Sequence, residues 1–186
     1  SVAIDRTTAE HMPTLVRYVA DSGVEVVAHG VATTQMISER MEPQEETAHI
    51  ASTLDALERA SGVRPTGWLG PDFGESTRTP GLLAEAGLDY VCDWGNDDQP
   101  YHMTTSTGSL VSLPATIEMD DFTALNVRHL PMDTYSRMVV DALFRDHPYG
   151  AAKFSILLLD HLGVFCEWYD VIRRSTDGEY RDLGCG

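Results

Sequence analysis

Apolar residues recur along this chain in two alternating patterns. Short apolar runs, such as Val2–Ile4, have the length of buried strands, and apolar residues at helical spacing, such as Ile50, Leu54 and Leu57, lie between them. The predicted strands are Val2–Ile4, Glu25–Ala28, Thr66–Leu69, Asp89–Cys92, Leu110–Leu113 and Lys153–Leu159. The predicted helices are Thr8–Ala20, Pro43–Ala60, Thr79–Ala86, Thr134–Phe144 and Phe165–Arg173.

Capping residues set the expected helix boundaries. Thr8 is the expected cap of the first helix, and Pro13 predicts either a kink in it or a later start at Met12. Thr79 followed by Pro80 has the form of a helix start, with Thr79 as the cap.

The alternation of strands and helices predicts an α/β fold with a largely parallel sheet. The loop after the first strand, Asp5-Arg6-Thr7, is not the glycine-rich phosphate loop usual in open doubly wound sheets. A closed or nearly closed βα barrel fits as well as an open sheet. We expect one domain over residues 1–172 and a polar tail over 173–186. Because the chain begins inside an apparent strand, we expect an upstream element to be missing.

Charge and cysteine content narrow the classes of function. The chain has 186 residues, a formal net charge of −16 and a pI near 4.6. This acidity argues against nucleic-acid partners and anionic membranes, and it fits either a solvated surface or a site that attracts cations. The three cysteines, Cys92, Cys166 and Cys185, form no CxxC pair. We therefore expect reduced thiols, Cys92 and Cys166 buried, and a cytoplasmic protein.

The segment Gly67–Tyr101 carries the strongest chemical signal, because carboxylate and aromatic residues follow two predicted strands there. Sites in βα folds form at the carboxyl ends of parallel strands. His29 and Asp93 each follow a strand directly, so His29 could move a proton or bind a metal, and Asp93 could act as a base. The alternatives are a structural histidine for His29 and a turn around Asp97 and Asp98.

Other polar residues could contribute to the same site. Asp72 and Glu75 lie on the loop after the third strand, where solvated residues are the usual case. Glu118, Asp120 and Asp121 follow the fifth strand, and at least one of them is expected at the same edge. His161 is on that edge, whereas His147 falls on the opposite one. The remaining histidines expected at the surface are His11, His49 and His129.

No nucleophile elbow, zinc-protease, P-loop or dinucleotide motif is present in the sequence. A site built of histidine and carboxylates indicates hydrolysis by an activated water instead.

Four blocks of this sequence resemble the polysaccharide deacetylase superfamily, most of all its allantoinase, cyclic imide hydrolase and peptidoglycan deacetylase-like branch. The blocks are GVEVVAHG, TLDALERASGVRPTGWLGP, ESTRTPGLLAEAGLDYVCDW with the following NDDQPY, and LVSLPATIEMDD. The resemblance covers roughly Val2 to Asp121. It implies a distorted (β/α) barrel, incomplete here at its N-terminus, that hydrolyses an amide-type C–N bond.

The resemblance carries over only part of the family's site. His29 matches the first histidine of the metal-binding HxxxH motif, but Thr33 stands at the second, and Leu69 replaces the family's arginine. Asp93-Trp94 keeps the Asp-Trp block, while the family's Asp-Asp motif would precede Ser1. The resemblance thus implies no cofactor, or a weakly held divalent metal such as zinc at His29.

Two hypotheses follow from the sequence. The first is a hydrolase for a small polar amide or sugar substrate, with possible homo-oligomers. Its expected catalytic residues are His29, Asp93 and Asp98, and its expected substrate contacts are Trp68, Asp72, Trp94, Asp97, Tyr101 and Glu118. The second is a non-catalytic homologue that binds a polar ligand or acts in an assembly.

Overall fold

The structure is a computed structural model that describes residues 1–94, 100–115 and 120–144, with the backbone alone for residues 140–144. It forms two compact units, Ser1–Pro114 and Ala115–Gly186, which we treat separately. The strand expected at Lys153–Leu159, the helix expected at Phe165–Arg173 and the tail 173–186 lie outside the described residues. The one-domain assignment of residues 1–172 stays a prediction.

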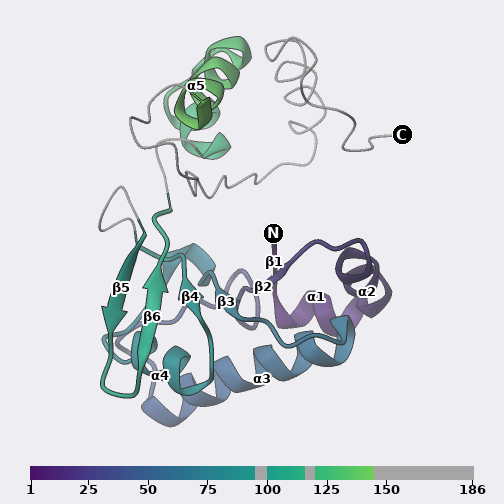
Figure 1. Cartoon of the computed structure of the whole chain (residues 1–186), viewed down its shortest axis with the longest axis vertical. Coiled ribbons are helices and arrows are strands. Elements are labelled where there is room, and N and C mark those ends of the chain that lie inside the picture. The colour runs from purple at the N-terminus through teal and green to yellow at the C-terminus, as the bar shows by residue number, and fades with distance from the viewer. Residues whose placement is uncertain (95–99, 116–119, 145–186) are drawn as a thin grey trace. The chain divides into compact units, whose positions relative to one another are not determined.

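The first unit is built on a six-stranded sheet in the order β1-β2-β3-β4-β6-β5 (Figure 1). The neighbours β1 to β4 and β6 pair in parallel, and β5 pairs antiparallel to β6. The bounds are β1 Val2–Ile4, β2 Val26–Ala28, β3 Gly67–Trp68, β4 Tyr90–Val91, β5 Tyr101–Thr104 and β6 Ser109–Ser112. The largely parallel α/β fold predicted from the sequence is confirmed.

Strand β5 was not predicted. Its four residues have alternating half-buried and exposed side chains, so it carries little apolar signal. It forms by hairpin pairing with β6, across a turn in which the Thr105 N–H donates to the Gly108 carbonyl at 2.8 Å. A polar edge strand of this kind is stabilised by its partner's backbone rather than by its own side chains.

The first predicted helix is two helices, α1 Arg6–His11 and α2 Pro13–Asp21. Pro13 has no N–H to continue α1, and Met12 leaves the helical region at φ −131°. The expected cap, Thr8, was wrong. Asp5 caps α1, since its Oδ1 accepts the Thr8 N–H at 2.6 Å.

Helix α3, Pro43–Ser61, supplies most of the core on the face of the sheet that it covers together with α4, Thr79–Glu85 (Figure 1). Ile50, Leu54 and Leu57 are buried, as their helical spacing predicts. The expected cap of α4, Thr79, was wrong: its hydroxyl lies inside the core and binds the loop before the helix and the carboxylate of Glu46.

The second unit contains a π-helical segment, Phe122–Val127, and α5, Met132–Phe144. Helix α5 begins two residues before the start predicted at Thr134. Ala124, Tyr135 and Val139 form its small buried cluster. Asp120 is buried and accepts the N–H and hydroxyl of Thr123 at 2.6 and 2.7 Å, so it serves as a local cap.

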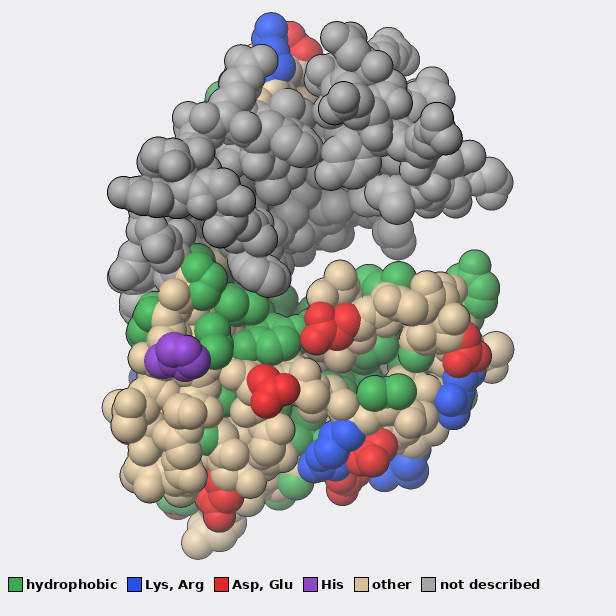
Figure 2. All heavy atoms as spheres, in the orientation of Figure 1, with side chains coloured by type: hydrophobic (Ala, Val, Ile, Leu, Met, Phe, Trp, Pro, Cys, Tyr) green, Lys and Arg blue, Asp and Glu red, His purple; other side chains and the backbone are tan. Residues whose placement is uncertain are grey.

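The described surface carries scattered charge. Figure 2 shows one face, on which Asp and Glu side chains lie in small separate groups and Lys and Arg side chains lie beside acidic ones. Among the described residues on that face no broad basic patch forms, as the net charge of −16 predicts. None of the described helices is long and apolar enough to span a bilayer.

Candidate active site at the carboxyl edge of the sheet

His29 directly follows β2 and is held by hydrogen bonds at the ends of β1 and β3, the strands on either side. Its backbone N–H donates to the Ile4 carbonyl at 3.1 Å, and its ring Nδ1 lies 2.6 Å from the Leu69 carbonyl. A carbonyl only accepts, so Nδ1 must carry a proton and Nε2 holds the lone pair of the neutral ring. His29 therefore has a fixed tautomer, with Nε2 as its acid–base or ligand atom.

The turn after His29 depends on Gly30. Gly30 has φ +66°, and a Cβ built on it would lie 2.9 Å from Pro71 Cδ and 3.0 Å from His49 Nε2. Only glycine fits a left-handed position with neighbours this close. The turn brings the Val31 N–H within 3.1 Å of His49 Nε2, which accepts its hydrogen bond.

His49 is a buried histidine, so its expected place at the surface was wrong. Its ring packs edge-on against Trp68, with centroids 6.5 Å apart. Burial lowers the pKa of His49, against the smaller opposing effect of Glu45 and Glu46. Because Nε2 accepts from Val31, the neutral ring also suits the hydrogen bond. His49 thus supports the backbone beside His29 from within the core.

Asp93 follows β4 and is 1% exposed. Its Oδ1 accepts a hydrogen bond from the Gly70 N–H, and its Oδ2 is buried with no hydrogen-bond partner. Burial raises the pKa of Asp93 well above its ordinary value, and the neighbouring Glu75 raises it further. Since His29 binds Leu69 and Asp93 binds Gly70, the end of β3 holds both predicted catalytic residues.

Glu75 was expected in solvent, and the structure corrects this. Its side chain is half-buried, with Oε1 buried and lacking a hydrogen-bond donor. Burial raises the pKa of Glu75, while hydrogen bonds with Asp93 and Trp94 lower it. The loop folds inward because Asp72 and Phe73 both adopt left-handed backbone, at φ +53° and +54°. No residue pattern in the sequence announces two such non-glycine residues in succession.

An ion pair between the buried Glu46 and the half-buried Arg78 anchors the loop that carries Glu75. Glu46 on α3 is 0% exposed and accepts hydrogen bonds from Ser76, Thr79 and Arg78 at 2.6–3.0 Å. Arg78 also donates to the Met41 carbonyl at 2.9 Å. These contacts tie the residues after Glu75 to α3.

The predicted substrate contacts are scattered in the structure. Trp68 is 0% exposed in the core, so it presents no surface to a substrate, because its side chain lies on the face covered by α3. Trp94 is 51% exposed beside Asp93, and Asp72 is exposed on the neighbouring loop. Tyr101 begins β5, two positions beyond β4 in the sheet.

The remaining predicted residues, Asp97, Asp98 and Glu118, lie outside the described residues, as does His161. Leu69, which stands where the resemblance implies arginine, is 7% exposed and contributes its carbonyl to His29. The structure therefore places His29 and Asp93 at the end of β3, and Glu75, which was missed, beside Asp93.

The described ligand set does not fit a firmly held metal. Within residues 1–94, 100–115 and 120–144, no three His, Cys, Asp or Glu side chains gather closely enough to hold an ion. His29 would be a single ligand there, and zinc normally takes three or four protein ligands.

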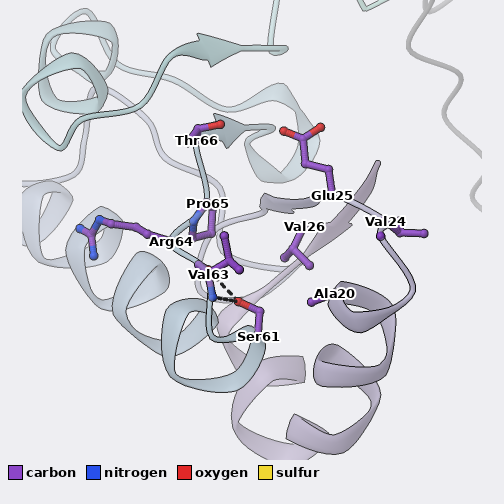
Figure 3. A pocket seen from close by; sticks show the side chains of 10 residues that line it. Ala20, Val24, Glu25, Val26, Ser61, Val63, Arg64, Pro65 and Thr66 are labelled. Atoms are coloured by element: carbon purple, nitrogen blue, oxygen red, sulfur yellow. Dashed lines mark hydrogen bonds between the residues drawn. The ribbon is translucent and has the colours of Figure 1, made fainter.

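A hollow of about 280 Å³ lies at the opposite edge of the sheet, where β2 and β3 begin (Figure 3). Val24, Val26, Val63 and Pro65 line it. Ser61 closes the turn beside it, since its hydroxyl donates to the Val63 carbonyl at 2.7 Å. This amino edge carries none of the predicted catalytic residues, so the hollow is separate from the candidate site.

Residues 2–91 match the polysaccharide deacetylase family. This segment belongs to the polysaccharide deacetylase superfamily, and an allantoinase is among the solved structures that the chain resembles. The resemblance stated from the sequence is thereby confirmed. No curated protein matches the sequence closely enough to be a relative.

Solved structures support the superfamily fold. The Puue allantoinase is 25% identical with a TM-score of 0.64, covering 76% of this chain and 48% of its own. A CE4 family pseudoenzyme from Bacillus anthracis is 11% identical with a TM-score of 0.61, covering 96% and 50%. A family 4 carbohydrate esterase from Streptomyces lividans, in complex with acetate, is 19% identical with a TM-score of 0.58, covering 94% and 72%.

This deacetylase-superfamily chain spans about half the length of the first structures it matches, at 51%, 48% and 49%. The α/β fold and its likeness to these structures confirm the predicted fold of the (β/α) barrel type.

Proposed function

We propose that this chain belongs to a hydrolase that splits a non-peptide amide C–N bond with an activated water. The substrate class is an N-acetyl sugar, a cyclic imide or a ureide. The superfamily and the likeness to an allantoinase support amide hydrolysis. The observation that carries the proposal is a pair of hydrogen bonds: the Leu69 carbonyl accepts from His29, and the adjacent Gly70 N–H donates to Asp93.

The proposed chemistry assigns a role to each group. A carboxylate, Asp93 or the predicted Asp98, takes a proton from water as the water oxygen bonds to the amide carbon. The C–N bond then breaks, and the nitrogen leaves with a proton given by an acid. His29 acts as that acid or polarises the carbonyl, using Nε2, since Nδ1 is bound to Leu69.

Substrate binding is proposed for the exposed residues near this edge. Trp94 offers an aromatic face for a ring, and Asp72 offers an acceptor for hydroxyl or N–H groups. Asp97, Tyr101 and Glu118 remain predicted contacts.

The test is turnover by the His29→Ala variant. We expect a loss of about 10²- to 10⁴-fold, the usual effect of removing a general acid or base. N-acetylated oligosaccharides, succinimide-like imides and allantoin are the substrates, with and without a divalent metal. His11→Ala, which removes an exposed histidine on α1, is the matched control. Wild-type turnover by His29→Ala would remove His29 from the mechanism.

A second candidate function is a non-catalytic homologue that binds a polar ligand or acts in an assembly. Two observations favour it. Thr33 stands where the resemblance implies the second metal-binding histidine, and no three-ligand metal cluster forms among the described residues. One neighbour of the same fold is itself called a pseudoenzyme, and a mutant of that protein is described as having restored activity. Ligand binding by calorimetry without turnover would support this alternative, and turnover of any panel substrate would exclude it.

The possible homo-oligomer and the cytoplasmic location stay predictions. Light scattering after size exclusion distinguishes a monomer from the possible homo-oligomer.

A further inference from the structure

Two carboxyl groups lie close together at the loop that follows β3. Asp93 accepts the Gly70 N–H, and its side chain is within hydrogen-bonding reach of Glu75. Each has one buried oxygen, Oδ2 and Oε1 respectively, that meets no donor group. A Cβ built on Gly70 would lie 2.9 Å from Asp93 Oδ2 and 2.9 Å from the Gly74 carbonyl, so Asp93 fills the space inside this loop.

Among the described residues, no basic side chain contributes to the pKa shifts of this pair. Arg78, on the same loop, is bound to Glu46 and to the Met41 carbonyl. Glu46 itself acts on Glu75 as another negative charge, and Cys92 beside Asp93 is a buried thiol whose pKa is raised to about 12, first by its burial and then by Asp93. The Trp94 side chain forms a hydrogen bond with Glu75.

Two carboxylates in contact in a buried site cannot both ionise near neutral pH, because their charges repel and water does not screen them. A proton between them removes one charge and gives the opposite oxygen the donor that it lacks. This accounts for both unpartnered oxygens at once.

We propose that Asp93 and Glu75 share one proton and act as an acid–base pair, with Glu75 as the half that meets substrate. The proposal rests on the proposed amide hydrolysis. Asp93, at 1% exposure, then acts on water only through Glu75, as a positioning residue that holds the proton, while Glu75 is half-buried and reaches the surface.

The pair balances the proposed reaction. Ionised Glu75 accepts the proton that water loses as its oxygen bonds to the carbonyl carbon, while Asp93 keeps the shared proton. Glu75 then gives the proton that it took from water to the nitrogen as the C–N bond breaks. The pair ends with one proton, as it began, and the products are a carboxylic acid and an amine or amide nitrogen.

The pair also predicts how stability depends on pH. Burial raises the pKa of both groups above the values of the unfolded chain, near 3.8 and 4.5, and a neighbouring negative charge adds to each shift, Glu75 for Asp93 and Glu46 for Glu75. The folded state then binds more protons than the unfolded state above that range, so stability falls as pH rises toward the folded pKa. His49 acts in the opposite direction below pH 6.5, since its pKa is lowered.

The first experiment compares chemical unfolding of the wild type and Glu75→Gln between about pH 5 and pH 8. Each proton retained on folding changes the unfolding equilibrium about tenfold per pH unit. We expect the ratio of the unfolding equilibrium constants of the two proteins to change by about tenfold per pH unit over part of this range. The effects of His49 and of other titrating groups cancel in that ratio. Glu85→Gln, an exposed glutamate on α4, is the matched control and should show no such difference.

A second measurement needs no variant and no activity. Carbon-13 NMR of the side-chain carboxyl groups in the wild type should show one carboxyl of the pair still protonated at neutral pH. Two carboxyl groups fully ionised at neutral pH would overturn the proposal, as would a flat difference between wild type and Glu75→Gln. Stabilisation of the wild type by added Mg²⁺ or Ca²⁺, lost in Glu75→Gln, would also overturn it in favour of a bound cation.

These readouts separate the two proposals. A protonated pair in a protein without turnover would leave the pair standing and contradict the hydrolase. In an active protein, Glu75→Gln should lower kcat and remove one limb of its pH profile, with little change in KM.

Discussion

Gly30 offers the sharpest test of how the candidate site is built. In Gly30→Ala, the added methyl group would occupy a left-handed position at φ +66°, which costs a non-glycine residue about 1–2 kcal/mol. The methyl carbon would also lie 2.9 Å from two Pro71 carbons and 3.0 Å from His49 Nε2. Overpacking of this kind costs about 1–3 kcal/mol. We therefore expect a loss of about 2–5 kcal/mol in the free energy of unfolding.

Gly23→Ala is the matched control, because Gly23 has φ +77° but a Cβ there would meet nothing within 4 Å. It should cost only the backbone term of about 1–2 kcal/mol. The assay is urea unfolding followed by tryptophan fluorescence, since Trp68 lies in the core of the same unit. If Gly30→Ala costs no more than Gly23→Ala, the close contacts with Pro71 and His49 do not exist in solution. The reasoning about the turn after His29 would then be refuted.

Three further predictions test other contacts. Arg78→Ala removes the half-buried cation paired with the fully buried Glu46, which keeps Ser76 and Thr79 as donors, so urea unfolding should show a loss of about 1–3 kcal/mol in the free energy of unfolding; a loss below about 0.5 kcal/mol would contradict the pairing. Cys92 should resist iodoacetamide at neutral pH and react on unfolding, because burial raises its pKa to about 12; rapid labelling of Cys92 in native protein, mapped by mass spectrometry, would contradict its burial. His49→Gln should lose less stability than the wild type as the pH falls below 6.5, since a histidine with a lowered pKa binds its proton better in the unfolded state; an unchanged pH dependence of the thermal midpoint would contradict a neutral His49.

Parts of the candidate site could be predicted because they depend on position along the chain. His29 and Asp93 each follow a short apolar run, and parallel strands bring their carboxyl ends to one edge. Their convergence on Leu69 and Gly70 therefore follows from strand order once the sheet is parallel.

Other parts could not be predicted because they depend on which way a side chain turns. Glu75 looked like a solvated loop residue, and only the left-handed backbone at Asp72 and Phe73 turns it toward Asp93. Trp68 looked like a site residue, but it lies on the face of the sheet that α3 covers.

The sequence by itself determined the alternation of strands and helices, the face of α3 that is buried, and the superfamily, because these depend on local spacing and on strings of neighbouring residues. The tertiary structure alone decided the pairing of β5, the burial of His49 and the contact between Glu75 and Asp93. These features join residues far apart in the chain, so their energies come from long-range packing that no local pattern records.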